Sequence, residues 1–261
     1  GMENGAPIEK DLSRVKYYFE KGIRYITLTH SKTNHISDSS YDENIQWHGL
    51  SEFGKSLIGE MNRVGIMIDV SHVSDEAFYQ AIQISKVPVI ASHSSLRYFT
   101  PGFKRNVDDD MLSKLAEKGG VIQINFGSSF ISQRSRNYSI EMEDYLKEKF
   151  GEERSNQSEE IINEGIKEFM SKNKYPFATL DEVLDHFDRV VSLVGIDHVG
   201  IGSDYDGVGD SLPIGLKDVS SYPNLIQGLL DRGYGQKEIE KILGGNLMRV
   251  WRESEDYASR H

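Results

Sequence analysis

The chain has 261 residues, a hydrophobic content of 38% and a formal net charge of −11. This length allows one large domain or two small ones, and the apolar content is sufficient for a sizeable core. The negative charge argues against a nucleic acid or an anionic membrane surface as the partner, because both require a basic surface. Cysteine is absent, so a disulfide, a zinc–thiolate cluster and a cysteine nucleophile are excluded.

Short β-branched runs alternate with helical patterns along the chain. The runs are almost continuous in apolar residues, which is typical of strands covered on both faces. None reaches the roughly 18 residues of a transmembrane helix. Strands that alternate with helices predict a parallel sheet and an α/β fold. We expect strands at 23–29, 66–70, 88–92, 121–126 and 198–203, and a short stub at 2–3.

The helices between these strands have recognisable ends. Ser51 is predicted to cap a helix that stops at Gly65, and Ser74 precedes a helix with acidic residues in its first turn. Two stretches interrupt the alternation: a polar loop at 31–48 and a charged helical insertion at 128–177, which is either a functional lid or a solvated decoration. Further helices are expected at 108–118, 180–194, 222–232 and 236–243.

Four of the five longer strands are followed by a residue that can bind a metal ion or move a proton. These residues are His30, His72, His93 and Asp204. The carboxyl ends of the strands in a βα barrel meet at one face, so side chains that are distant in sequence would converge there. Three of the four are histidines, although the chain has only eight.

Each of these residues also has a structural explanation when it is taken alone. His72 could cap the following helix, His93 could be buried and satisfied by backbone groups, and Asp204 could be a turn residue. His30 could belong simply to the polar loop. We interpret the remaining internal histidines as structural or solvated: His35, His48, His186 and His198.

The residue types favour a metal-dependent hydrolase. Imidazoles and carboxylates without cysteine are the usual ligands of a catalytic zinc ion. Zinc lowers the pKa of a bound water, and a nearby Asp can take the proton of that water. An Arg would hold a substrate carboxylate through two hydrogen bonds, and Lys104–Arg105 is the candidate pair.

Several segments resemble the renal or membrane dipeptidase family, whose members are zinc peptidases related to the amidohydrolases. The segments are RYITLTH, GLSEFGKSLIGEMNRVGIMIDVSHVS, PVIASHSS, KRNVDDDML and VGIGSDYDGV, and the resemblance runs from about Glu3 to about Arg252. It implies a (β/α)8 TIM-like barrel with a two-zinc site at the carboxyl ends of the strands.

The resemblance also implies roles for individual residues. The expected activity is hydrolysis of dipeptides, in which a metal-activated water attacks the peptide carbonyl. Glu3, His72 and His93 match metal ligands, and Asp204 matches the proton shuttle. His30 matches the histidine that contacts the substrate and the tetrahedral intermediate, and Arg105 matches the arginine that binds the substrate carboxylate.

The chain departs from the family pattern in its first segment and near the pocket. The family carries a His-x-Asp motif on its first strand, and no such motif precedes Glu3. We therefore expect a barrel without its first two strands and one or two zinc ions, the second lacking its usual ligands. Gly127 stands where relatives can carry a tyrosine, and the insertion is longer than expected, which leaves the substrate preference open.

Two alternatives to an active dipeptidase are a catalytically impaired domain with weak or single metal binding and another amidohydrolase-type activity, such as a lactonase or deaminase. We expect a single domain over 1–261. The expected partners are a dipeptide and, optionally, a second copy of the chain in a homodimer. The sequence leaves the cellular location open between exported or periplasmic and cytoplasmic.

Overall fold

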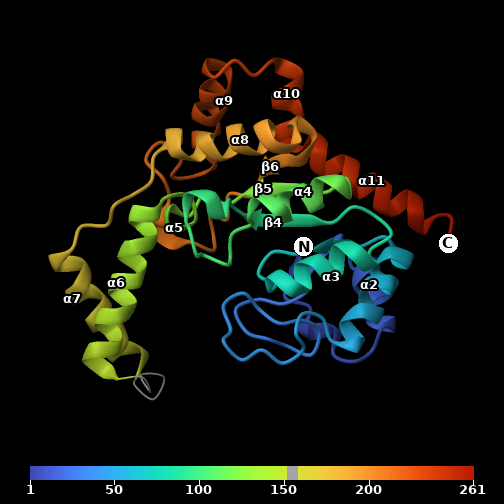
Figure 1. Cartoon of the computed structure of the whole chain (residues 1–261), viewed down its shortest axis with the longest axis horizontal. Helices are drawn as coiled ribbons and strands as arrows, with labels where there is room; N and C mark the ends of the chain where they lie inside the picture. Colours follow the sequence, from blue (N-terminus) through green and yellow to red (C-terminus); the bar gives the residue numbers. More distant parts are fainter. Residues whose placement is uncertain (152–157) are drawn as a thin grey trace.

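The computed structural model describes residues 1–151 and 158–261 and contains a parallel sheet of six strands in chain order (Figure 1). The predicted α/β class is therefore confirmed, and the stub at Met2–Glu3 is a strand that pairs with its neighbour. Among the described residues, β1 pairs only with β2 and β6 only with β5, so the eight-stranded barrel is not seen. The strands are β1 (Met2–Glu3), β2 (Tyr25–Thr27), β3 (Met67–Asp69), β4 (Ile90–Ser94), β5 (Val121–Ile124) and β6 (Val199–Ile201).

A row of helices covers the outer face of this sheet. Neighbouring helices pack in sequence, with α1 on α2, α2 on α3, α3 on α4 and α4 on α8. The α-helices are α1 (Ser13–Glu20), α2 (Glu52–Val64), α3 (Asp75–Ile84), α4 (Asp109–Glu117), α5 (Ser128–Ile131), α6 (Gln133–Phe150), α7 (Glu159–Lys172), α8 (Leu180–Val194), α9 (Tyr222–Asp231), α10 (Gln236–Glu240) and α11 (Asn246–Ala258).

The predicted helix caps are confirmed. The Ser51 hydroxyl accepts a hydrogen bond from the backbone N–H of Gly54, and Gly65 ends α2 with a φ of 89°. The Ser74 hydroxyl accepts one from the N–H of Ala77 at the start of α3. Each cap satisfies a backbone donor that has no partner within its helix, which fixes where the chain turns from strand to helix.

The inner face of the sheet is arranged in layers. Side chains alternate between faces along a strand, so Met67 and Ile90 face the same side, where they form an apolar cluster with Val121 and with Val250 of α11. Asp69 follows Met67 on this face and lies one step nearer the carboxyl end of the sheet. The other face contributes Ile68 and many further residues to the main core beneath the helices.

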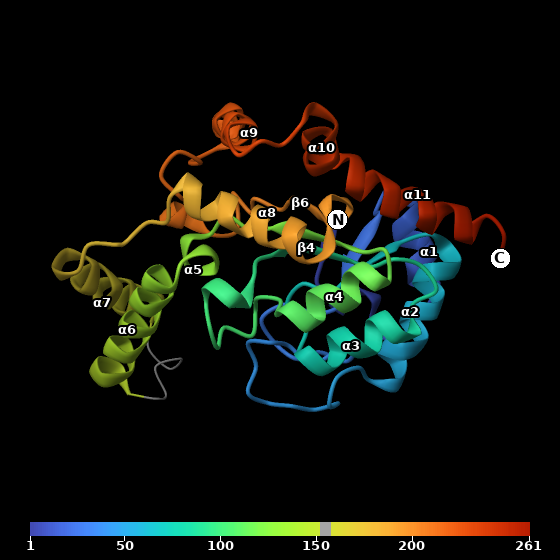
Figure 2. The same ribbon diagram turned by 45° about the horizontal axis from the view of Figure 1, so that its top comes forward.

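The two predicted interruptions are present. The 31–48 segment forms a loop, which the Asp38 carboxylate organises by accepting hydrogen bonds from the N–H groups of Gln46, Trp47 and Gly49. The described part of the 128–177 insertion is helical. Figures 1 and 2 show α6 and α7 side by side, projecting away from the sheet. The insertion residues 152–157 lie outside the described residues.

Several expectations about element bounds are wrong. The strand expected at 88–92 runs from Ile90 to Ser94, so His93 lies inside it. The helix expected at 236–243 is α-helical only from Gln236 to Glu240. It is followed by a π-helical segment, Lys241–Gly245, in which Gly244 has a φ of 154°. Helices α1 and α11 were not expected. Among the described residues, no helix is both long and apolar enough to cross a membrane.

Candidate active site

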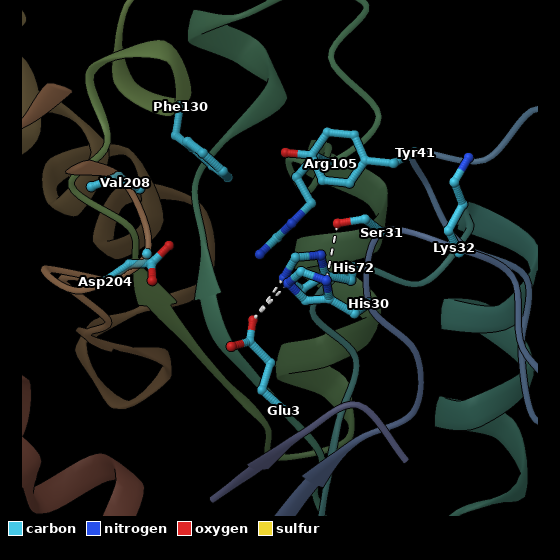
Figure 3. Close-up of a pocket in the computed structure, with 11 residues that line it drawn as sticks. Glu3, His30, Ser31, Lys32, Tyr41, His72, Arg105, Phe130, Asp204 and Val208 are labelled. Atoms are coloured by element: carbon cyan, nitrogen blue, oxygen red, sulfur yellow. Dashed lines mark hydrogen bonds and ion pairs between the residues drawn. The ribbon is translucent and has the colours of Figure 1, made fainter. Parts of the chain in front are cut away.

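Glu3 and three histidines converge at the carboxyl end of the sheet. The Glu3 Oε1 atom lies 3.0 Å from His72 Nε2 and 3.0 Å from His93 Nε2, and 3.4 Å from His30 Nε2. The two ring nitrogens of His72 and His93 are 2.8 Å apart. Figure 3 shows Glu3 pointing toward the rings of His30 and His72, which are tilted by 36° to one another. The structure thus brings together three of the four residues of the strand-end pattern, and it adds Glu3, which only the family resemblance indicates.

The backbone around these residues aims their side chains. His72 follows β3 with a φ of 70°, and Asp204 follows β6 with a φ of 56°. This left-handed conformation is costly for residues other than glycine and is concentrated at functional sites. The pairing between β4 and β5 shifts register between Ala91 and Ser94, the interval that contains His93. Such irregularities redirect individual side chains.

The electrostatic environment keeps the Glu3 carboxylate charged and the His72 ring neutral. Hydrogen bonds from His72 and His93 hold the pKa of Glu3 well below its ordinary value. Burial lowers the pKa of His72 to about 3, with further contributions from the Arg105 charge and from the neighbouring histidines, and against the opposing effect of Glu3. A neutral imidazole has a free lone pair, which metal coordination requires.

The donor set at this point fits a metal ion. The ligand atoms of Glu3, His30 and His72 lie within 4.8 Å of one another, and His93 Nε2 reaches the same carboxylate oxygen. Imidazole nitrogens and a carboxylate oxygen are ligands that zinc accepts. The buried Nδ1 atom of His72 has no hydrogen-bond partner among the described residues, which leaves that ring held mainly through its Nε2 side.

Arg105 supplies a buried positive charge next to this cluster. Its side chain is 3% exposed and donates hydrogen bonds to Ser94 Oγ and to the carbonyl oxygen of His93, each across 2.7 Å. Its Nε atom is buried and has no partner among the described residues. Burial lowers the pKa of Arg105, although an arginine remains protonated under ordinary conditions. The neighbouring Lys104 is exposed, so only one member of the predicted pair reaches the site.

Asp204 lies on the opposite wall of the pocket (Figure 3). The cavity between the walls has a volume of about 450 Å³ and is also lined by Tyr41 and Phe130, which is a typical size for a small-molecule site. Burial raises the pKa of Asp204, while the nearby His93 and a hydrogen bond from Asn125 oppose the shift. Asn125, Tyr41 and Phe130 were not singled out from the sequence.

The other histidines lie outside this cluster. His186 is completely buried, where its Nδ1 atom accepts a hydrogen bond from the N–H of Leu96 and its Nε2 atom donates to the carbonyl of Ile131. His198 contacts the carbonyl of Gly120 through Nδ1. These two agree with the interpretation as structural residues, which is based on their position in a helix and at the start of a strand.

The fold and the site together define an α/β protein with a candidate metal centre of histidines and a carboxylate at the carboxyl ends of parallel strands. A family model described as Membrane dipeptidase (Peptidase family M19) matches residues 1–261. The chain therefore belongs to the membrane dipeptidase family, and the resemblance stated from its motifs is confirmed.

Relatives and solved structures agree with this assignment. An uncharacterized dipeptidase of Schizosaccharomyces pombe is 36% identical over 258 residues, which cover 98% of this chain and 52% of the relative. The crystal structure of the probable dipeptidase PvdM from Pseudomonas aeruginosa has a TM-score of 0.87 and 31% identity, and the match covers 99% of this chain and 69% of that one.

A metallopeptidase from Rhodobacter sphaeroides, solved with a phosphinate mimic of the dipeptide L-Ala-D-Ala, has a TM-score of 0.75 and 25% identity. That match covers 97% of this chain and 62% of that one. The chain spans about half the length of the curated relatives it matches.

Proposed function

We propose that this chain is a zinc-dependent dipeptidase. The observation that carries the proposal is the convergence of Glu3 Oε1 with the Nε2 atoms of His72 and His93, each 3.0 Å away. Glu3 and His72 line one pocket together with Arg105 and Asp204. A metal centre, a buried cation and a carboxyl group with a raised pKa are the components of a peptide-hydrolysing site. The relatives are named dipeptidases, which supports the same activity.

We assign the metal to Glu3, His72 and His93. These residues offer one carboxylate oxygen and two imidazole nitrogens, and a catalytic zinc site typically has three protein ligands. When bound, zinc supplies a water molecule of lowered pKa as the nucleophile. The second oxygen of the Glu3 carboxylate would be available to a further ion, for which further ligands would be needed.

The substrate is held by its charged end. The Arg105 guanidinium is buried, and its Nε atom, which finds no partner in the described part of the chain, retains hydrogen-bonding capacity. No carboxylate of the described residues forms an ion pair with this buried cation, which favours an anionic ligand. The carboxylate of a dipeptide has the matching charge and geometry. His30, which lines the pocket beside Glu3, is placed to donate a hydrogen bond to the oxygen of the tetrahedral intermediate.

Asp204 is the proton shuttle in this proposal. Its carboxylate faces the metal centre across the pocket and has a raised pKa, so it can accept a proton from the nucleophilic water and return it to the leaving amine. The hydrogen bond from Asn125 holds one of its oxygens and leaves the other for the reaction.

The finer architecture is also a proposal. Six parallel strands in chain order with helices outside agree with part of a (β/α)8 barrel. We expect the chain to form a single domain and propose a lid role for the described residues of the insertion, 128–151 and 158–177, because Phe130, from the first helix of the insertion, lines the pocket. A homodimer stays a prediction, which light scattering would check.

Hydrolysis of a panel of dipeptides that includes L-Ala-D-Ala, with and without added zinc, tests the proposed activity. The Asp204→Asn variant serves as the blank. We expect turnover that depends on zinc and disappears in the variant. Absence of turnover, with zinc bound to a folded chain, would contradict the proposal and favour the impaired-domain alternative, which the named dipeptidase relatives do not otherwise support.

A further inference from the structure

A completely buried carboxylate lies directly beneath the candidate metal centre. Asp69 ends β3 on the inner face of the sheet and is 0% exposed. Its carboxylate accepts hydrogen bonds from Thr27 Oγ1 at 2.5 Å, from the Ser71 N–H at 3.0 Å and from the Ser92 N–H at 2.9 Å. Because each of these groups donates, the Asp69 carboxylate serves here only as an acceptor.

Ser92 connects this carboxylate to His93. Its hydroxyl oxygen lies 2.6 Å from Asp69 Oδ2 and 2.7 Å from His93 Nδ1. A serine hydroxyl has one proton to donate, and an ionised carboxylate can only accept. The Ser92 proton therefore points to Asp69, so the proton between Ser92 and His93 must belong to His93 Nδ1. The Nε2 atom faces Glu3, and once it gives up its own proton it offers the lone pair that a metal ion requires.

The backbone of His93 is held as firmly as its ring. Its N–H donates to Ser71 Oγ at 3.1 Å, and its carbonyl accepts from Arg105 at 2.7 Å. The His72 ring differs from it, because its buried Nδ1 atom has no partner among the described residues. The two candidate ligands are thus supported unequally, and His93 is the one that is fixed before any ion arrives.

We propose that Asp69, acting through Ser92, is a positioning residue that sets the tautomer of His93 and thereby prepares the metal centre. The inference rests on the proposed metal-dependent function. A carboxylate or other acceptor behind a ligating histidine fixes the orientation of its ring and increases its basicity, and loss of such a partner typically weakens metal binding about 10- to 100-fold. Here a serine hydroxyl transmits the effect from a carboxylate that does not itself touch the ring.

Zinc affinity of the full chain, measured by competition with a chromophoric chelator, tests this relay. We expect Ser92→Ala to bind zinc about 10- to 100-fold more weakly than the wild type, and Ser92→Thr, which keeps the hydroxyl, to restore most of the affinity. Ser85→Ala is the matched control, because Ser85 is also a buried serine. Its hydroxyl forms hydrogen bonds with Val87 and Asn62, neither of which belongs to the candidate site. Equal zinc affinities in Ser92→Ala and Ser85→Ala would overturn the proposal.

A spectroscopic measurement on the unmodified chain keeps the test independent of any variant's folding. Long-range ¹H–¹⁵N correlation of the metal-free protein should show a proton on His93 Nδ1. An Nδ1 atom without a proton would overturn the relay. Neither readout requires turnover, so loss of zinc affinity in Ser92→Ala without dipeptidase activity in the wild type would contradict the proposed activity and leave the relay supported.

Discussion

The Asn125 side-chain amide donates a hydrogen bond to Asp204 Oδ2 across 2.8 Å, and its own oxygen accepts one from the N–H of Gly127 at 2.7 Å. The second bond fixes which end of the amide faces Asp204, so a donor always meets the carboxylate. This donor favours the ionised form and opposes the larger effect of burial, which raises the pKa of Asp204.

The pH dependence of hydrolysis should report on this pair. Asp204 must be ionised to accept a proton, so we expect kcat/KM to fall as the pH drops through its raised pKa, above the ordinary value of 3.8. Asn125→Ala removes a group that lowers the pKa, and the acidic limb should move to higher pH. A profile of kcat/KM against pH for both proteins checks this, and an unchanged limb would contradict the pairing.

Asp204→Asn should abolish dipeptide hydrolysis while zinc binding stays close to that of the wild type. The amide keeps the shape of the side chain and cannot accept the proton of the nucleophilic water. Zinc titration and single-turnover hydrolysis measure the two properties separately. Wild-type turnover in this variant would remove Asp204 from the proton path, and a parallel loss of zinc affinity would make it a ligand.

Arg105→Ala should raise KM for free dipeptides by more than about tenfold, because a charge-assisted pair is lost on substrate binding. Arg105→Lys keeps the charge without the forked donors, so we expect an intermediate KM. Dipeptide amides, which lack the carboxylate, provide the control and should show similar KM values in all three proteins. Unchanged KM for free dipeptides in Arg105→Ala would exclude the assigned role.

His186, which lies outside the candidate site, should make the stability of the fold depend on pH. Burial lowers its pKa to about 4 from an ordinary 6.5. The folded chain therefore binds this proton less readily than the unfolded chain, and the associated stability is present above pH 6.5 and is lost as the pH falls toward 4. The loss amounts to at most about 3 kcal/mol.

Urea unfolding of wild type and His186→Gln across this pH range checks the expectation. The variant lacks the titrating ring and should show a flatter dependence of the unfolding free energy on pH. The other histidines are common to both proteins and cancel in the difference. Parallel curves for the two proteins would mean that His186 contributes nothing to the acid sensitivity.

Gly202→Ala should destabilise the fold and reduce activity together. A Cβ atom at Gly202 would lie 2.3 Å from the Ser92 carbonyl oxygen and 2.7 Å from that of Gln123, which forces β6 away from its neighbours just before Asp204. We expect a loss on the order of 1–3 kcal/mol. Gly59→Ala, at a helical position where a Cβ meets nothing within 4 Å, is the control and should stabilise slightly. Thermal unfolding measures both.

The sequence predicts most of the sheet because alternation and helix caps are local signals. Ser51, Ser74 and Gly65 mark helix ends that the structure confirms. Helix α1 carries no side-chain cap, and α11 follows a pair of glycines at Gly244–Gly245 that indicates a stop. These two helices depend on packing against the rest of the molecule, which no local pattern reports.

Part of the candidate site is likewise visible in the sequence, and part of it is formed only by the tertiary structure. The position of His30, His72 and Asp204 after strands is visible in the sequence, and the structure places all three around one pocket. The register shift at His93 and the hydrogen bonds to Asp69 are tertiary features. An acidic residue in an apolar strand, as in the IMIDV run, is the signal that could have pointed to Asp69.

The left-handed backbone at His72 and Asp204 lowers the stability of the fold, and the proposed reaction needs the side chains at these two positions. Each conformation costs on the order of 1–3 kcal/mol in a residue with a side chain, and glycine would adopt it with little strain. His72→Gly and Asp204→Gly would relieve that strain and at the same time remove a metal ligand and the proton shuttle of the proposed reaction. A laboratory evolution campaign that scored variants only by heat tolerance would therefore enrich chains that have lost the site.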